Sequence, residues 1–426
     1  MDRRTYLATG LTAGAAAFAG CADLGSSEDT ETDEPSDDQT DDDNDQPDDT
    51  ESDDSEPEPS GLTGTFDDFE DLDLWFAHED LGSVEADTER YYEGSQSAVF
   101  DPEDDGQARI RRSLDEPIDI RDVVPGIAMT AETDSIVRIQ LQDEDGDYVE
   151  YSQRVTDDMD LERHNFGLTR IRGDPDLSEI IVLQVIHWSE DARLWVDDFH
   201  FVPAADQPGK VMLQFNGGYE THYTEALPVL QEHGLTASAF VPTNRIGPDA
   251  AAAGDRLTYD QIEELSSAGW TIGSFSAQGT QLSDVDSAGD DDLETNITDP
   301  IEWLEEEGYE EGARFFAFPG SEYTQASYDL VQEHYDLAFA GRAPAQGYAG
   351  NPHLCSVTDS PEPGEGPELL EWTAEHGGIT TIPFYRLEES DTITAFQETA
   401  ARLEELVDEG ELEVITPAEM ADQYVF

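Results

Sequence analysis

The chain has 426 residues, of which 101 are Asp or Glu and only 20 are Lys or Arg, so its formal net charge is -81. This charge excludes binding to nucleic acid or to an anionic lipid surface, because both would repel the protein. Residues 22–60 hold 19 of the acidic residues, so most of the charge lies on the rest of the chain. Such self-repulsion is tolerable where molar salt screens it within a few ångströms, and we therefore expect a secreted protein of an extreme halophile.

Residues 1–21 have the pattern of an export signal. The Arg3-Arg4 pair, followed by Tyr6-Leu7, resembles a twin-arginine signal, and the apolar stretch up to Gly20 is too short and too rich in Ala and Gly for a good membrane span. The stretch ends in Phe-Ala-Gly-Cys21, which resembles a lipobox and predicts lipidation of Cys21. The alternative is an ordinary cleaved signal in which Cys21 is incidental. We expect an extracellular protein that contacts the membrane only through its lipid.

Residues 22–60 consist mainly of Asp, Glu, Ser, Thr and Pro, with no large apolar residue after Leu24. Such a segment cannot bury enough apolar surface to offset the entropy lost on ordering, and like charges extend it. The composition predicts a disordered acidic tether between the anchor and the folded domains.

Residues 61–203 show the patterns of β-strands. Residues 135–141 and 193–201 alternate apolar and polar side chains, residues 180–186 are continuously apolar, and Asp145-Gly146 indicates a hairpin. These patterns predict a β-sandwich, with a jelly roll as the expected topology. The segments TFDDFED, YYEGSQSAVF and LWVDDFHF resemble jelly-roll carbohydrate-binding modules of the galactose-binding-like kind. Trp75, Trp188 and Trp195 could stack on sugar rings, although tryptophans of a sandwich are more typical of its core.

Residues 204–426 alternate apolar strand-like runs with amphipathic helical patterns. Strands are expected at 211–215, 237–241, 270–274, 315–318, 337–340 and 379–384. Helices are expected at 223–233, 259–268, 301–307, 326–334 and 395–408. This βα alternation predicts a parallel sheet closed as a barrel.

The order of the pieces in residues 204–426 resembles the polysaccharide deacetylase (NodB-like) family. The strand ending in Gln214-Phe-Asn-Gly-Gly218 corresponds to the family's Thr-Phe-Asp-Asp-Gly turn, and residues 273–282 correspond to its Gly-x-His-Ser/Thr-x-x-His-x-x-Leu segment. Phe-Ala-Phe318-Pro-Gly, YDLAFAG and the closing LEVITPAEMAD occupy the places of further family segments. The resemblance covers about 210 residues. It implies a (β/α) barrel that hydrolyses amide or N-acetyl C–N bonds of a polysaccharide.

The resemblance also implies a divalent metal such as zinc, held by one Asp and two His, with a second Asp as the base. In this chain the base position is Asn216, the three ligand positions are Gly217, Phe275 and Gly279, and a late His position is Tyr385. We therefore predict that no catalytic or metal-binding residue of the family is retained and that no cofactor is bound.

Other candidate ligands in this half of the chain lack partners in the sequence. Glu220 and His222 follow the turn, but one Glu and one His from a single segment do not complete a metal site, and a helix start capped by Thr221 is the simpler interpretation. His353 and His376 stand alone, and Arg314 and Asp336 are either remnants of a site or surface charges.

Three hypotheses follow for the function. The first is a lipid-anchored, inactive deacetylase-like protein that binds a polysaccharide or cell-surface glycan. The second is an active hydrolase with a rearranged site, and the third is a structural or interaction protein of the cell envelope. For the first hypothesis, the expected glycan cleft is lined by a set of mostly aromatic residues at the barrel mouth: Asn216, Tyr219, Phe275, Phe318, Tyr323 and Tyr385.

Overall fold

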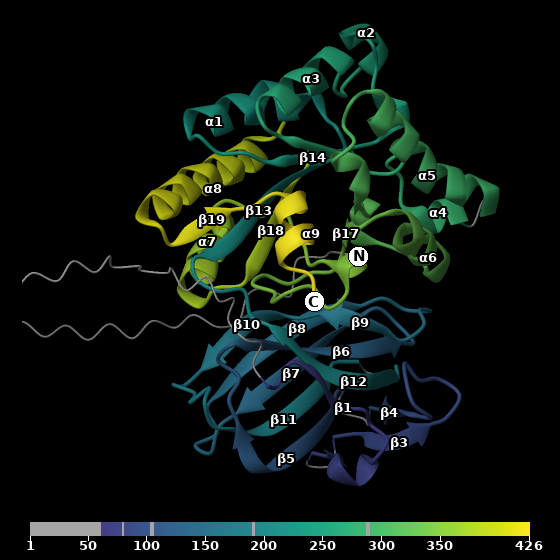
Figure 1. Cartoon of the computed structure of the whole chain (residues 1–426), viewed down its shortest axis with the longest axis vertical. Coiled ribbons are helices and arrows are strands. Elements are labelled where there is room, and N and C mark those ends of the chain that lie inside the picture. The colour runs from purple at the N-terminus through teal and green to yellow at the C-terminus, as the bar shows by residue number, and fades with distance from the viewer. Residues whose placement is uncertain (1–60, 79–80, 103–105, 190–191, 287–289) are drawn as a thin grey trace, which may run out of the picture. The chain divides into compact units, whose positions relative to one another are not determined.

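The structure is a computed structural model, and it describes residues 61–78, 81–102, 106–189, 192–286 and 290–426 (Figure 1). The twin-arginine motif, Cys21 and the acidic tether lie outside the described residues. The described residues belong to one compact unit. None of its described helices is both long enough and apolar enough to cross a bilayer.

The N-terminal part of this unit consists of two antiparallel sheets of six strands each. The first sheet has the order β3 (Ser83–Asp87), β4 (Ser97–Asp101), β12 (Leu194–Pro203), β6 (Val123–Ala131) and β9 (Glu162–Asn165), and β1 (Gly64–Asp67) also pairs with β12. The second has the order β10 (Gly167–Arg172), β8 (Tyr148–Val155), β7 (Ser135–Gln142), β11 (Ile180–His187), β5 (Ala108–Ile118) and β2 (Phe76–Ala77). Strands of both sheets contribute to one apolar cluster. The sheet-rich N-terminal region is thus confirmed, and the jelly-roll topology stays a prediction.

The three tryptophans of this region differ in burial. Trp75 belongs to the core, where its ring lies 5.1 Å from that of Phe69 and its Nε1 donates to Asp67. Trp195 is also buried, with 3% of its surface exposed, whereas Trp188 is 51% exposed. The core interpretation therefore holds for Trp75, whereas Trp195 is buried outside the apolar cluster and Trp188 is exposed.

The C-terminal part is built on a seven-stranded parallel sheet. Its order is β17 (Leu337–Phe339), β16 (Phe315–Ala317), β15 (Thr271–Ser274), β14 (Ser238–Val241), β13 (Gly209–Asn216) and β18 (Ile379–Phe384), with β19 (Leu412–Val414) on β13. Within the described residues, no ladder pairs β17 with β18. Instead, Cys355 bridges to Phe339 and Gln346 bridges to Ile379. The parallel sheet is confirmed, but it forms a half-barrel rather than the fully paired barrel that we predicted.

Helices cover the outward face of this sheet in two groups (Figure 1). Leu213, Phe215 and Ile382 point into a cluster with apolar side chains of α1 (Leu227–Glu232), α3 (Tyr259–Ser267), α7 (Glu365–His376) and α8 (Ser390–Glu409). Phe316 and Phe318 point into a second cluster with α4 (Leu282–Asp286), α5 (Asp290–Glu306) and α6 (Gln325–His334). The other two α-helices of the described residues are α2 (Ala250–Ala253) and α9 (Pro417–Gln423).

The helix starts follow from local sequence. Capping boxes begin α3 at Thr258 with Gln261, α6 at Thr324 with Ser327, and α9 at Thr416 with Glu419. A helical segment also begins near Thr221, as expected, but Thr221 does not cap it. The Thr221 hydroxyl makes no capping hydrogen bond and instead accepts from the backbone N–H of Leu387, and a π-helical turn, His222–Ala226, precedes α1.

Buried amides join the two parts of the unit. The Asn165 side chain donates to the carbonyls of Asn351 and Leu354 at 2.7 and 2.9 Å and accepts from the backbone N–H of Asn351 at 3.0 Å. Gln153 likewise donates to the hydroxyl of Ser356 at 2.7 Å. Because these polar atoms are buried, the segment that spans the gap between β17 and β18 is held against the N-terminal sheets.

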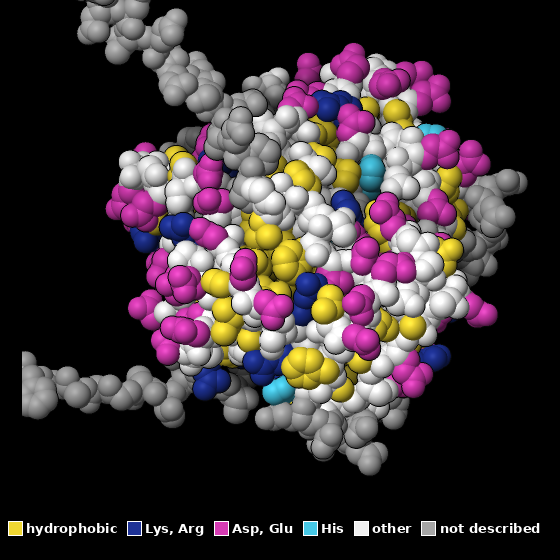
Figure 2. Space-filling model, turned by 60° about the horizontal axis from the view of Figure 1, so that its bottom comes forward, with side chains coloured by type: hydrophobic (Ala, Val, Ile, Leu, Met, Phe, Trp, Pro, Cys, Tyr) yellow, Lys and Arg dark blue, Asp and Glu magenta, His cyan; other side chains and the backbone are white. Residues whose placement is uncertain are grey.

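On the face shown in Figure 2, acidic side chains are spread out rather than collected in one patch. Asp and Glu occur across the whole visible surface, with few Lys and Arg between them. This distribution argues against one local docking patch for a cationic partner.

Candidate functional site

The turn after β13 forms the centre of the candidate site. Asn216 ends the strand and is 3% exposed, and its Nδ2 donates to Oε1 of Gln214 at 3.2 Å. The Asn216 Oδ1 and the Gln214 Nε2 have no partner among the described residues. Both atoms are therefore buried polar groups whose hydrogen-bonding capacity is not met by the described residues.

The place of the family's metal-binding carboxylate is filled by other side chains. Gly217 has φ +98°, and a Cβ atom there would lie 2.7 Å from Cε2 of Tyr219 and 3.2 Å from Nη1 of Arg256. The same Nη1 donates a hydrogen bond to the Gly217 carbonyl. No side chain fits at this glycine unless Tyr219 or Arg256 moves.

Two guanidinium groups hold the Tyr219 ring. Arg256 lies 3.9 Å and Arg386 lies 4.6 Å from the ring centroid, and Arg386 is in turn ion-paired to Asp255 and to Glu388. Cation–π contacts of this kind stabilise an aromatic ring in one orientation. No motif indicated either arginine. The only signal was the scarcity of basic residues in so acidic a chain.

The two histidine positions of the family are also closed. Phe275 follows β15 and packs into the apolar interior of the half-barrel with Phe240 and Phe339. Gly279 has φ +63°, and a Cβ there would lie 2.9 Å from Cβ of Pro242 and 3.5 Å from Cδ1 of Phe275. A longer side chain at position 279 would therefore meet atoms already in place.

Tyr385, at the late histidine position, lies beside Asn216. Burial raises the pKa of the Tyr385 hydroxyl, and a hydrogen bond with the Asn216 side chain partly offsets this rise. The Tyr385 carbonyl contacts Nε2 of His222 at 3.0 Å. Burial lowers the pKa of His222 to about 3, so this histidine is neutral and, as a donor to a carbonyl through Nε2, supports the backbone beneath the turn.

Four of the six residues expected to line a glycan cleft come together. Asn216, Tyr219, Phe275 and Tyr385 lie around the end of β13, but only Tyr219 and Tyr385 are partly exposed. Phe318 and Tyr323 do not join them. Their rings pack against each other at 5.4 Å inside the cluster of α4, α5 and α6.

The remaining candidates have structural partners. His353 Nε2 contacts the carbonyl of Tyr335 at 2.8 Å, and the His376 ring lies 4.2 Å from that of Trp372. Arg314 pairs with Asp336 at 2.7 Å on the surface. Each of these four polar residues therefore has a structural role in the fold, and none needs a bound ligand to explain it.

The donor set does not fit a divalent metal ion. The three ligand positions of the family hold two glycines and a phenylalanine, none of which has a metal-binding atom. Over the described ranges, no three His, Cys, Asp or Glu side chains are grouped so that they could hold a metal ion. No hydrolytic step through a metal-bound water can therefore be written for the described residues.

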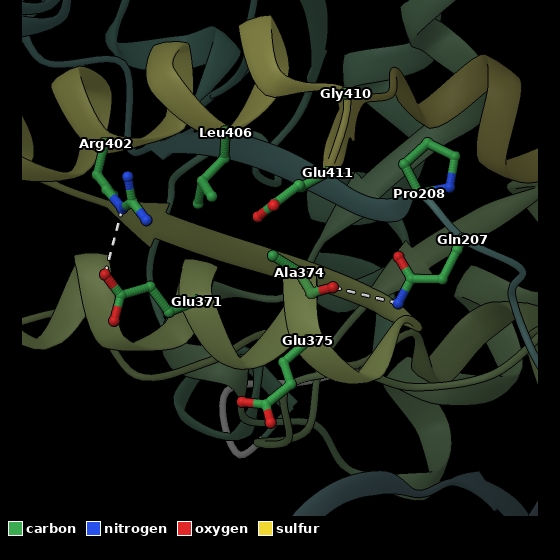
Figure 3. A pocket seen from close by; sticks show the side chains of 9 residues that line it. All are labelled: Gln207, Pro208, Glu371, Ala374, Glu375, Arg402, Leu406, Gly410 and Glu411. Carbon is green, nitrogen blue, oxygen red and sulfur yellow. Dashed lines mark hydrogen bonds and ion pairs between the residues drawn. The ribbon is translucent and has the colours of Figure 1, made fainter. Parts of the chain in front are cut away.

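A cavity of about 640 Å³ lies at the opposite end of the strands of the same sheet, between α7 and α8 (Figure 3). Arg402 pairs with Glu371 at 3.2 Å there, and Gln207 donates to the carbonyl of Ala374 at 3.2 Å. The cavity lies near the residues just before β13 and β19, at their amino-terminal ends. Because parallel sheets place their chemistry at the carboxyl ends of strands, this cavity is not the candidate site.

One stretch of the C-terminal part matches a known protein family by sequence. The family model for polysaccharide deacetylases matches residues 204–336, from before β13 to the end of α6 and the residues before β17. No curated protein matches the chain by sequence.

Several solved structures resemble parts of the chain at low identity. A family 4 carbohydrate esterase from Streptomyces lividans, in complex with acetate, is 16% identical with a TM-score of 0.33, covering 50% of this chain and 95% of that one. A family 4 acetyl xylan esterase from Clostridium thermocellum is 16% identical with a TM-score of 0.33, covering 50% of this chain and 89% of that one. A family 11 carbohydrate-binding module of a Clostridium thermocellum cellulase is 14% identical with a TM-score of 0.27, covering 34% of this chain and 96% of that one. This chain covers only 25% of an exo-beta-agarase and 64% of a Streptococcus pyogenes deacetylase that it also resembles.

Proposed function

We propose that the protein is an extracellular, lipid-anchored glycan-binding protein of a halophile, built on a deacetylase-type domain that no longer supports metal-dependent turnover. The observation that carries the proposal is the filling of the Gly217 position by Tyr219 and Arg256. A missing ligand alone could be replaced by a neighbouring residue, but here the space for the ligand is also taken.

The family match supports a polysaccharide as the partner, while the site chemistry argues against turnover. Asn216 cannot act as a general base near neutral pH, because its amide does not accept a proton there. Its environment differs from that of an ionised carboxylate, since its nearest polar partners are the amide of Gln214 and the hydroxyl of Tyr385. Fold and chemistry point in different directions, and the chemistry of the site decides activity.

The test combines acetate release, metal content and glycan binding on the mature chain in molar KCl. We expect no acetate from acetylated xylan or chitin oligosaccharides above the level given by the Asn216→Ala variant, less than one equivalent of zinc or cobalt after dialysis, and retention of at least one glycan. Acetate release that Asn216→Ala abolishes would favour the active hydrolase instead. Failure to bind any glycan would favour a role as an envelope scaffold.

The anchor is a separate part of the proposal and rests on the sequence pattern at Cys21. Cys21→Ser should release the protein into the medium, because the acidic tether offers no apolar surface that would hold it on a membrane. Cys355→Ser is the matched control, since Cys355 is buried in the half-barrel and should leave membrane retention unchanged. Retention of the Cys21→Ser protein would contradict the lipid anchor.

A further inference from the structure

A cavity of about 640 Å³ opens at one end of the first antiparallel sheet, outside the candidate site. Four segments line it: the loop between β3 and β4, the end of β6, the loop between β8 and β9, and the start of β12. Its residues are Glu89, Arg90, Tyr91, Tyr92, Ala131, Glu132, Asp158, Met159, Asp160, Leu161, Arg193 and Trp195.

The cavity has an apolar floor and a polar rim. Ala131, Met159, Leu161 and Trp195 are buried and form the floor. Tyr91 is 46% exposed, and the other rim residues that stand in solvent are charged residues of both signs: Glu89, Arg90, Glu132, Asp158, Asp160 and Arg193. Most of the lining is polar, and a polar lining around a smaller apolar floor suits a ligand that carries many hydroxyl groups.

The charged groups of the rim differ in how far they are already satisfied. Arg193 and Arg90 both lie over the Trp195 ring, at 4.8 and 4.7 Å from its centroid, and Arg193 is paired with Glu132 at 2.6 Å. Among the described residues, the Arg90 guanidinium makes no ion pair, and neither do the Asp158 and Asp160 carboxylates. One donor group and two acceptor groups therefore remain available at the rim.

The loop that carries Arg90 and Tyr91 is held in place before any ligand binds. The backbone N–H groups of Tyr92 and Glu93 donate to the buried carboxylate of Asp197 at 2.7 and 3.1 Å. The hydroxyl of Ser97 donates to the Arg90 carbonyl at 2.6 Å. Asp87 fixes the other side of the loop, because it accepts from Nε1 of Trp195 at 2.8 Å. A loop held in this way needs little ordering on binding, which favours affinity.

We propose that this cavity binds a short segment of an uncharged polysaccharide, an inference that rests on the proposed glycan-binding function and gives it a location. The exposed ring of Tyr91 offers an apolar face to the C–H side of a sugar ring. Asp158 and Asp160 accept from its hydroxyl groups, and the Arg90 guanidinium donates to its oxygens. An acidic glycan is disfavoured, since the rim holds more carboxylates than guanidinium groups and the whole chain carries a charge of -81.

The experiment measures binding of the mature chain in molar KCl to an array of neutral, amino and acidic oligosaccharides. Two variants change exposed rim groups, whose loss the fold should tolerate. They are Tyr91→Ala and the double change Asp158→Asn with Asp160→Asn. Each should weaken binding to the neutral glycan by about tenfold or more. Tyr259→Ala is the matched control, because Tyr259 is a similarly exposed tyrosine, at 38%, on α3 and outside the cavity.

The outcomes separate this inference from the proposed function. Binding by the parent that both cavity variants retain in full would overturn the location and leave the glycan-binding function standing. Binding confined to amino or acidic sugars would overturn the uncharged class. A parent that binds nothing on the array would overturn the glycan-binding function, and the cavity site with it.

Discussion

Gly217→Ala is the most direct test of the filled site, because two costs can be worked out separately. At φ +98°, a residue with a Cβ atom costs about 1–2 kcal/mol. The new Cβ would also lie 2.7 Å from Cε2 of Tyr219, and forcing extra atoms into a packed place costs about 1–3 kcal/mol. The free energy of unfolding should therefore fall by about 2–5 kcal/mol.

The second cost is not easily avoided by moving the tyrosine. Arg256 and Arg386 both lie over the Tyr219 ring, and Arg256 also donates to the Gly217 carbonyl. A shift of the ring would weaken two cation–π contacts, each of which contributes about 0.5–1 kcal/mol or more. The clash with the added methyl group would thus be relieved only at the expense of these contacts.

Thermal unfolding in molar KCl, with Gly308→Ala as the control, measures the effect. Gly308 has φ +89°, and its Cβ position has no atom within 4 Å, so its substitution reports the backbone cost alone. Gly217→Ala should be more destabilising than this control by about 1–3 kcal/mol. In a Tyr219→Ala background most of the excess should disappear, since the ring atom at 2.7 Å is gone and only the Arg256 contact at 3.2 Å remains.

If Gly217→Ala and Gly308→Ala prove equally destabilising, the space beside Gly217 is open and the reasoning is refuted. If the excess persists without the Tyr219 ring, the ring is not the obstacle. The expected result has a consequence for engineering. Restoring the four family residues at 216, 217, 275 and 279 will not create a metal site unless Tyr219 is removed as well.

Three further predictions concern pH, cohesion and reactivity. His222 has a pKa of about 3 in the folded protein and about 6.5 when unfolded, so its stabilising contribution is complete above pH 6.5 and falls by about 1.4 kcal/mol for each pH unit below it. His222→Gln should remove that part of the slope in unfolding measured from pH 7 to 5, and an unchanged slope would contradict the buried neutral ring. Asn165→Ala should lower the free energy of unfolding by about 2–4 kcal/mol, because three buried hydrogen bonds are lost, whereas Asn244→Ala at an exposed position should change it little. Burial raises the pKa of the Cys355 thiol, so a thiol reagent at pH 8 should modify it only in denaturant, and rapid labelling of the native protein would show that the interior of the half-barrel is open.

Most strands of the C-terminal part were predictable from their apolar runs, but the direction of individual side chains was not. Phe275 and Phe318 both follow strand ends and both were expected at the mouth. Side chains alternate along a strand, and Ala317 faces the interior, so Phe316 and Phe318 face the helices. The sequence of β16 is apolar on both faces and therefore has no alternation from which this register could be read.

The helices were also only partly predictable from the sequence. Residues 365–376 were not among the expected helices, and Gly364, Gly366 and Pro367 are residue types that favour turns. In the structure Gly364 adopts φ +89° just before α7, and Pro367 lies in its first turn, where a missing N–H costs nothing. The contact between Arg256 and the Gly217 carbonyl joins residues 39 positions apart and had no local signal at all.

The site is closed to a cation by charge as well as by shape. Arg256 Nη1 lies 3.2 Å from the position that a Cβ on Gly217 would take, so an ion bound through a carboxylate there would face a guanidinium at short range. A divalent cation and a guanidinium group about 4 Å apart repel each other by about 2 kcal/mol in water. At the effective dielectric constant of a protein surface the repulsion is about 8 kcal/mol. A carboxylate introduced at position 217 would sooner pair with Arg256 than recruit a metal ion, because that pairing satisfies both charges without an additional ligand. The lack of metal-binding side chains at positions 217, 275 and 279 and the presence of Arg256 beside Tyr219 therefore act in the same direction, and a metal site at this turn would require that both be changed.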